Sequence, residues 1–215
     1  MKYPSKTPNE RFADTIVHIM GVSGAGLAGL ILVILAFGSG QLLLALACAL
    51  YVTTIIGSKV FSALYHTFPR DALRPLLRRL DHAAIYTLIA GTFTPLLVFV
   101  GSTWSFVVLA AVWVIAIPAV LLKLLVQNLD SKWSLVSYLA LGWIGVLALP
   151  DMWRNLPVAA LAFVIAGGLI YTAGTFFYAR KTQPFRYAIW HSFVLVGTSA
   201  FLTAVYMTVL TTPVT

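Results

Sequence analysis

The sequence predicts an all-α integral membrane protein, a bundle of seven transmembrane helices. Of its 215 residues, 60% are hydrophobic and only 9% are charged, with a mean hydropathy of +0.95; few soluble domains combine so little charge with so much apolar surface. Apolar segments of about 20 residues, the length that crosses a bilayer core, fill nearly the whole chain. We therefore expect one membrane domain over residues 1–215, with a short polar N-terminal tail over about residues 1–14.

The first apolar segment runs from Thr15 to Phe37. It is too long for a signal-peptide core and has no convincing cleavage site, so we expect an uncleaved first helix. Proline rings at Pro95 and Pro118 interrupt two of the later segments and predict kinks. The later segments are Gln41–Phe68, His82–Val100, Trp104–Leu125, the short Ser134–Leu149, Pro157–Tyr178 and Ala188–Leu210.

Basic residues gather at one end of these predicted helices, in the N-terminal tail and in every second loop. The opposite loops and the C-terminus contain only Arg154. By the positive-inside rule, the N-terminus is expected in the cytoplasm and the C-terminus outside. The net charge of +8 therefore indicates topology rather than nucleic-acid binding, and the basic loops suit contact with anionic lipid head groups. The residues in question are Lys2, Lys6, Arg11, Arg70, Arg74, Arg78, Arg79, Lys123, Lys132, Arg180, Lys181 and Arg186.

Polar residues that suit a metal site lie at the same predicted end. Ser62 and His66 are four residues apart, so they share a helix face near the end of the second segment. Asp81 and His82 open the third segment, and His191 lies near the start of the seventh. Imidazole suits zinc, and an aspartate can orient a water molecule as a base, so these groups are candidates for a hydrolytic centre.

Several longer motifs resemble one family along nearly the whole chain. The strings SALYHTF, LDHAAIYTLIAGTFTP, SLVSYLALGW, GGLIYTAGTFFY and PFRYAIWHSFVLVG are similar to the haemolysin III family of bacterial membrane proteins. That family is related to the progestin and adipoQ (adiponectin) receptors and, more distantly, to alkaline ceramidases. The resemblance implies a seven-helix protein of the bacterial inner membrane with a cytoplasmic N-terminus and an intramembrane zinc site near the cytoplasmic face.

The same resemblance assigns roles to individual residues. The family's metal is held by the histidine of an S-x-x-x-H motif and by two histidines of an H-x-x-x-H motif on the seventh helix, with a serine and an aspartate alongside. By position, these are Ser62, His66, His191 and Asp81, with Asp81 acting through water. The remaining ligand position holds Tyr187 instead of histidine. Tyrosine is an uncommon zinc ligand, so three alternatives stay open: Tyr187 or His82 completes a weaker site, water replaces the ligand, or the site is empty.

Three further residues are candidates for the pocket or for positioning roles. Lys59 lies seven residues before His66, on nearly the same helix face and about 10 Å deeper. We expect it to point into the bundle and neutralise a carboxylate or a substrate charge, or else to pair locally or snorkel. His82 is expected to support the site rather than ligate, because it points about 100° away from Asp81. His18 is expected to form an interfacial hydrogen bond rather than to belong to the site.

Two classes of function compete on these grounds. The first is a zinc-dependent membrane hydrolase of a lipid amide or ester, in which Asp81 is the general base and Ser62 helps to bind the oxyanion or the water. The second is a non-enzymatic, lipid-sensing, receptor-like or membrane-homeostasis protein. A cytolysin comes third, and a transporter is disfavoured because no internal repeat or chain of acidic groups is evident. Membrane lipids are the expected partners in each case.

Overall fold

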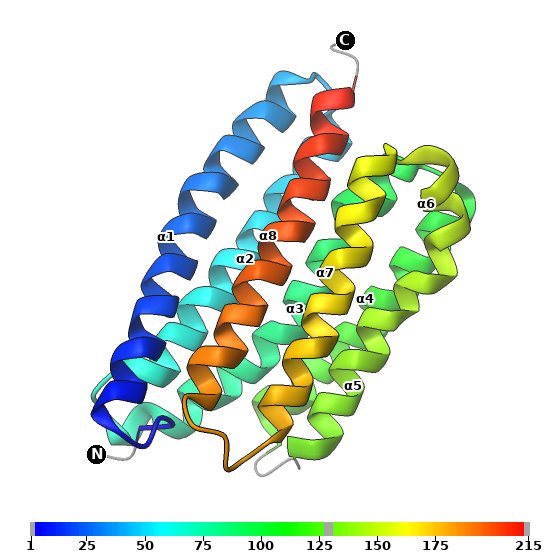
Figure 1. Cartoon of the computed structure of the whole chain (residues 1–215). Coiled ribbons are helices and arrows are strands. Elements are labelled where there is room, and N and C mark those ends of the chain that lie inside the picture. The colour runs from blue at the N-terminus through cyan, green and yellow to red at the C-terminus, as the bar shows by residue number, and fades with distance from the viewer. Residues whose placement is uncertain (1–2, 127–130, 213–215) are drawn as a thin grey trace.

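Each predicted apolar segment forms helix in the computed structural model, which describes residues 3–126 and 131–212 except the side chains of residues 131 and 132. Within this part of the chain, seven helical spans are long and apolar enough to cross a membrane, which confirms the seven-helix prediction. The start of α1 and the end of α8 lie at opposite ends of the bundle (Figure 1). The helices are α1 (Pro8–Gly38), α2 (Leu42–Thr67), α3 (Arg74–Val100), α4 (Thr103–Leu125), α5 (Ser131–Trp143), α6 (Leu149–Asn155), α7 (Val158–Ala179) and α8 (Arg186–Thr211), with short 3₁₀ turns η1 (Asp71–Leu73) and η2 (Ile144–Ala148).

Helix α1 begins at Pro8, so residues 8–14 of the predicted polar tail form the first turns of the helix. A reciprocal cap starts the helix: the Thr7 hydroxyl accepts from the Glu10 amide at 3.2 Å, and the Glu10 carboxylate accepts from the Thr7 amide at 3.1 Å. Such a capping box satisfies amide groups that have no partner in the first turn. The early start adds almost two turns to α1 and makes Asp14 and His18 helical neighbours.

Helix α3 also begins earlier than predicted, at Arg74 rather than His82, with Pro75 in its first turn. Proline suits this position because the first amides of a helix lack carbonyl partners. Much of the expected basic loop is therefore helical. As a result, Asp81 lies inside the helix, facing its neighbours, rather than at its entrance.

The fifth span is broken rather than a single short helix ending at Leu149. Helix α5 passes through η2 into α6, and together they form a span that reaches Asn155. At the break, a Cβ on Gly145 would stand 2.5 Å from the Phe93 ring, so glycine allows this close approach. The Trp104 indole donates to the carbonyl oxygen of Leu147 at 2.8 Å and binds one backbone group that the irregular turn leaves available.

Helices α2, α3 and α8 form the interior of the bundle. Their most apolar windows are 56%, 67% and 44% buried, against 17–22% for the other four spans. Helix α2 packs between α1 and α3, and α8 packs between α1 and α7. The polar residues predicted to carry chemistry, apart from His18 on α1, all lie on these central helices. Cytoplasmic placement of the N-terminal end and kinks at Pro95 and Pro118 stay predictions, and Lys2 and the Lys132 side chain lie outside the described part.

Candidate metal centre and cavity

Close packing of α1, α2 and α8 brings distant polar residues to one depth. Helices α1 and α2 run antiparallel, with Asp14 against His66 at one end and Gly29 against Val52 further along. A Cβ on Gly29 would lie 2.5 Å from a Val52 methyl carbon, so a small residue is needed for this approach. Helix α8 runs parallel to α1 and carries His191 to the same level.

Asp14 is the centre of the resulting cluster and is only 2% exposed. Its Oδ2 accepts from His66 Nδ1 at 2.7 Å, and its Oδ1 accepts from His191 Nδ1 at 2.6 Å. The Ser5 hydroxyl also donates to Oδ2, at 3.1 Å. Because a carboxylate only accepts, both imidazoles present Nδ1–H to it and keep Nε2 as an acceptor. The Ser62 hydroxyl lies 3.4 Å from His191 Nε2.

His18 completes the cluster from α1. Its ring centroid lies 4.3 Å from that of His191 and 5.2 Å from that of His66. Its Nε2 is buried, lies 3.5 Å from Asp14 Oδ1 and has no hydrogen-bond partner among the described residues. The expected interfacial hydrogen bond of His18 is therefore wrong. A buried nitrogen without a partner is costly, and a bound cation would satisfy it.

The four side chains of Asp14, His18, His66 and His191 fit a divalent metal ion. One ligand atom from each lies within 4.8 Å of the other three, and all four residues are buried. Tetrahedral zinc with bonds of about 2.0–2.2 Å needs ligand atoms roughly 3.3–3.6 Å apart. Ligand atoms within 4.8 Å of one another would have to move by on the order of 1 Å to reach this spacing. Three imidazoles and a carboxylate are a donor set that zinc accepts.

Comparison with known proteins agrees with this architecture. The model of the family described as "Haemolysin-III related" matches residues 6–202. The chain belongs to the haemolysin III family. It is 33% identical to Hemolysin-3 of Bacillus cereus over 204 residues, which cover 94% of this chain and 93% of that protein. It is also 33% identical to the Hemolysin-3 homolog of Bacillus subtilis (strain 168) over 195 residues, covering 90% and 92%. Haemolysin III proteins are related to the progestin and adipoQ receptor group.

Seen against the haemolysin III pattern, the cluster contains two of the expected ligands and two unexpected ones. His66 and His191 lie together, with ring centroids 4.5 Å apart. Tyr187, one turn before His191, places its ring 4.9 Å from that of His66. The other two members of the cluster, Asp14 and His18, come from α1.

Asp81 and His82 lie on α3, outside the four-residue cluster. Asp81 is 9% exposed, and its carboxylate lies 3.6 Å from His82 Nδ1. The same nitrogen of His82 lies 2.8 Å from the carbonyl oxygen of Arg78, and the His82 carbonyl accepts from the Tyr138 hydroxyl at 3.0 Å. His82 is thus held by its own helix and by α5. Both side chains nevertheless line the same cavity as the clustered histidines.

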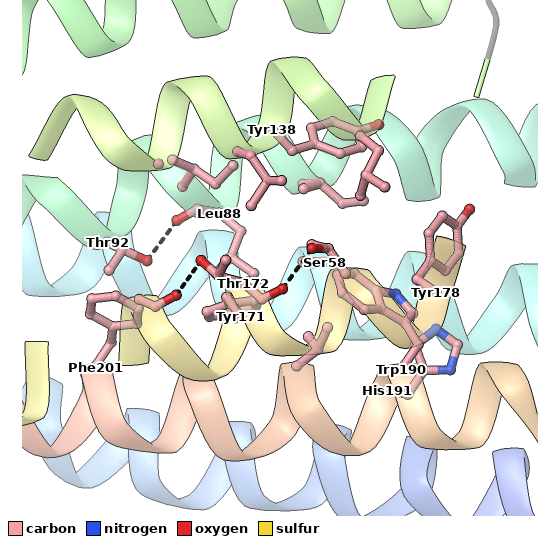
Figure 2. A pocket seen from close by; sticks show the side chains of 18 of the residues that line it. Ser58, Leu88, Thr92, Tyr138, Tyr171, Thr172, Tyr178, Trp190, His191 and Phe201 are labelled. Atoms are coloured by element: carbon pink, nitrogen blue, oxygen red, sulfur yellow. Dashed lines mark hydrogen bonds between the residues drawn. The ribbon is translucent and has the colours of Figure 1, made fainter. Parts of the chain in front are cut away.

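The cavity has a volume of about 630 Å³ and extends through the bundle beside the cluster. Figure 2 shows His191, Trp190 and Tyr178 at one end, Thr92 and Phe201 at the other, and Tyr138 on the opposite wall. Ser62 and Lys59 of α2 also line it. His82 and His18 line it as well.

Asp14 is the residue that sequence reasoning missed. Two local signals were present: the T-P-N-E run at residues 7–10 is a capping box that starts the helix, and Asp14 precedes His18 by four residues. Together they place a carboxylate and an imidazole on one face of α1. Assignment of Asp14 to a polar tail concealed this pair.

Proposed function

We propose that this chain is an intramembrane, zinc-dependent hydrolase that cleaves an amide or ester of a membrane lipid. The observation that carries the proposal is the buried cluster of Asp14, His18, His66 and His191 beside an apolar cavity. Ionisable groups inside a membrane bundle are expensive, and a concentration of four beside a cavity is characteristic of function rather than packing. The N-terminal end, with its basic residues, is assigned to the cytoplasm, in the bacterial inner membrane.

The cavity has a lateral route by which a lipid substrate could enter. Trp143 and Val146, on the α5–η2 segment, and Ile165 and Leu169, on α7, all line it. Yet they are 48%, 49%, 44% and 54% exposed on the bundle surface. Residues that face both the cavity and the exterior mark the wall between α5 and α7 as the opening. In a membrane, that surface faces acyl chains, so a substrate need not leave the bilayer.

Each polar group has a role in the proposed hydrolysis. A zinc ion held by three of the four clustered side chains, with its fourth position open, would polarise the scissile carbonyl and make water a better nucleophile at neutral pH. Asp81 accepts a proton from the attacking water and returns it to the leaving amine or alcohol as the carbonyl–nitrogen or carbonyl–oxygen bond breaks. Ser62, beside His191, donates a hydrogen bond to the oxygen on which negative charge develops.

The test combines metal content with turnover in detergent-purified protein. We expect close to one zinc per chain by elemental analysis, lost in His66→Ala and His191→Ala. A fluorescent N-acyl amine and the matching acyl ester serve as substrates. Asp81→Asn should abolish turnover while keeping zinc, whereas Ser199→Ala, an exposed serine on α8, should change neither. Bound zinc without turnover of either lipid would contradict the hydrolase.

A lipid-sensing protein is the second candidate, and one observation favours it. Both oxygens of Asp14 already accept hydrogen bonds from histidines, so much of the cluster is satisfied without an ion. This function requires ligand binding that survives Asp81→Asn and chelation. The names of the Bacillus relatives raise cytolysis as a third outcome, which release of haemoglobin from erythrocytes by the purified chain would test directly.

A further inference from the structure

Lys59 is a buried lysine without a protein partner in the described part of the chain. It is 7% exposed, and no hydrogen bond or ion pair joins it to another described residue. Its stem passes Gly21 of α1, where an added Cβ would stand 3.5 Å from Lys59 Cδ, and the residue lines the cavity. A lysine inside a membrane bundle requires a counter-charge or water.

Each described carboxylate in or beside the cavity already lies next to a histidine, so none is left to pair with Lys59. Four cationic residues line it, and Asp81 is the single carboxylate among the described lining residues. Asp81 lies within 3.6 Å of His82, and the two oxygens of Asp14 face His66 and His191. Arg78 and Lys181 are exposed and Arg186 is half-buried, so among the described lining residues Lys59 is the buried basic group that lacks a counter-charge. The lining cations are Lys59, Arg78, Lys181 and Arg186.

The position of Lys59 defines how a ligand would lie. It is three residues, about 4.5 Å of helix rise, from Ser62, which contacts the metal cluster. Gly91 of α3 packs against Thr54 of α2, so the residues of α3 beyond Gly91 lie deeper than Lys59. From that depth onward the cavity is lined mostly by large apolar side chains. These include Phe93, Leu96, Leu149, Met152 and Phe201.

We infer that the cavity binds an amphiphile with an anionic head group, a carboxylate or a phosphate, placing the head at the Lys59 ammonium and the hydrocarbon chain among the apolar residues beyond it. The ammonium can donate three hydrogen bonds to the head group. The head group in turn supplies the negative charge that Lys59 lacks in the protein. Binding of this ligand does not depend on hydrolysis, so the inference goes beyond the proposed function and can stand if that function fails.

The test measures binding of matched probes to the full-length chain in detergent. Palmitate and hexadecyl phosphate carry the anionic head, whereas hexadecanol and hexadecylamine share the chain without it. We expect at least one anionic probe to bind about 10-fold or more tightly than hexadecanol, and hexadecylamine to bind weakest. Lys59→Met should abolish the preference and Lys59→Arg should keep it. Preference for palmitate or for hexadecyl phosphate alone identifies the head group as carboxylate or phosphate.

Two comparisons keep the inference distinct from metal binding and from a general loss of fold. Lys123→Met removes another buried lysine, one that bonds Ser134 and does not line the cavity, and should leave the preference unchanged. Each measurement is made on zinc-loaded and on chelated protein, with thermal unfolding as the check of fold. Equal affinity for all four probes would overturn the inference. So would a preference that persists in Lys59→Met, or one that chelation removes.

Discussion

Two regions of the bundle differ in whether their buried polar groups all have hydrogen-bond partners. Where α3 meets α5, polar groups are paired: Tyr86 and Ser137 share a hydrogen bond of 2.6 Å, and Tyr138 donates to the His82 carbonyl at 3.0 Å. Where α1, α2 and α8 meet, three histidines surround one carboxylate, and His18 Nε2 and Lys59 have no hydrogen bond among the described residues. Buried polar groups that are hydrogen-bonded to each other hold helices together. Buried polar groups that lack a partner beside a cavity can instead be satisfied by a bound ligand.

The largest expected effect comes from Asp14→Asn, which removes the charge at the centre of the cluster. Whether Asp14 ligates the ion or orients the imidazoles, zinc affinity should fall by about 10- to 100-fold. Competition with a chelating dye measures the affinity, and zinc per chain measures occupancy. Asp81→Asn is the matched control, because Asp81 lies outside the cluster, and it should retain zinc.

A second substitution sharpens this result. Tyr187→His restores the haemolysin III pattern one turn before His191, with its ring near His66. In the Asp14→Asn background it should recover zinc binding, because one imidazole replaces one carboxylate as a ligand. Failure to recover zinc would mean that Asp14 chiefly positions His66 and His191, and that a new ligand on α8 cannot replace that role.

His18→Gln should lower zinc affinity by roughly 10-fold, since it removes one of four donors and leaves the carboxylate in place. His82→Gln is the appropriate comparison, because His82 is anchored to Arg78 and lies outside the cluster. Calorimetric titration with zinc measures both. If both variants lost the same affinity, the distinction between the two regions would be wrong.

Gly29→Ala tests the packing that supports the cluster. The new methyl group would meet Val52 at 2.5 Å, so α1 and α2 must shift apart, at a cost of about 1 kcal/mol or more. Thermal unfolding in detergent should move down by a few degrees. Gly24→Ala on the same helix has no atom within 4 Å and should leave the melting temperature nearly unchanged.

The smallest effect is expected in the paired region. Tyr86→Phe removes a single hydrogen bond to Ser137, which in membrane proteins is worth about 0.6 kcal/mol. Unfolding by denaturing detergent should register this small loss of stability, while zinc content stays at the value of the unmodified chain. A loss of zinc in this variant would connect the two regions and contradict their independence.

The sequence predicted the helices well because hydropathy alone determines which segments enter a bilayer. Helix starts were harder, since prolines and caps at Pro8 and Pro75 extend α1 and α3 into polar sequence that hydropathy assigns to tails and loops. His66 and His191 stood out because they interrupt apolar runs. Asp14 did not stand out, because its role depends on the antiparallel register of α1 and α2. Local sequence patterns do not specify the register in which two helices pack.

The cluster joins the first and last helices, since Asp14 and His191 are 177 positions apart in the chain. During synthesis, α1 and α2 enter the membrane long before α8 exists. Until then Asp14 and His66 have neither their third partner nor a closed wall around them. The four-residue cluster can therefore be completed only after the final helix is inserted, and any product truncated before α8 lacks His191. Assembly order thus restricts the complete donor set to finished molecules.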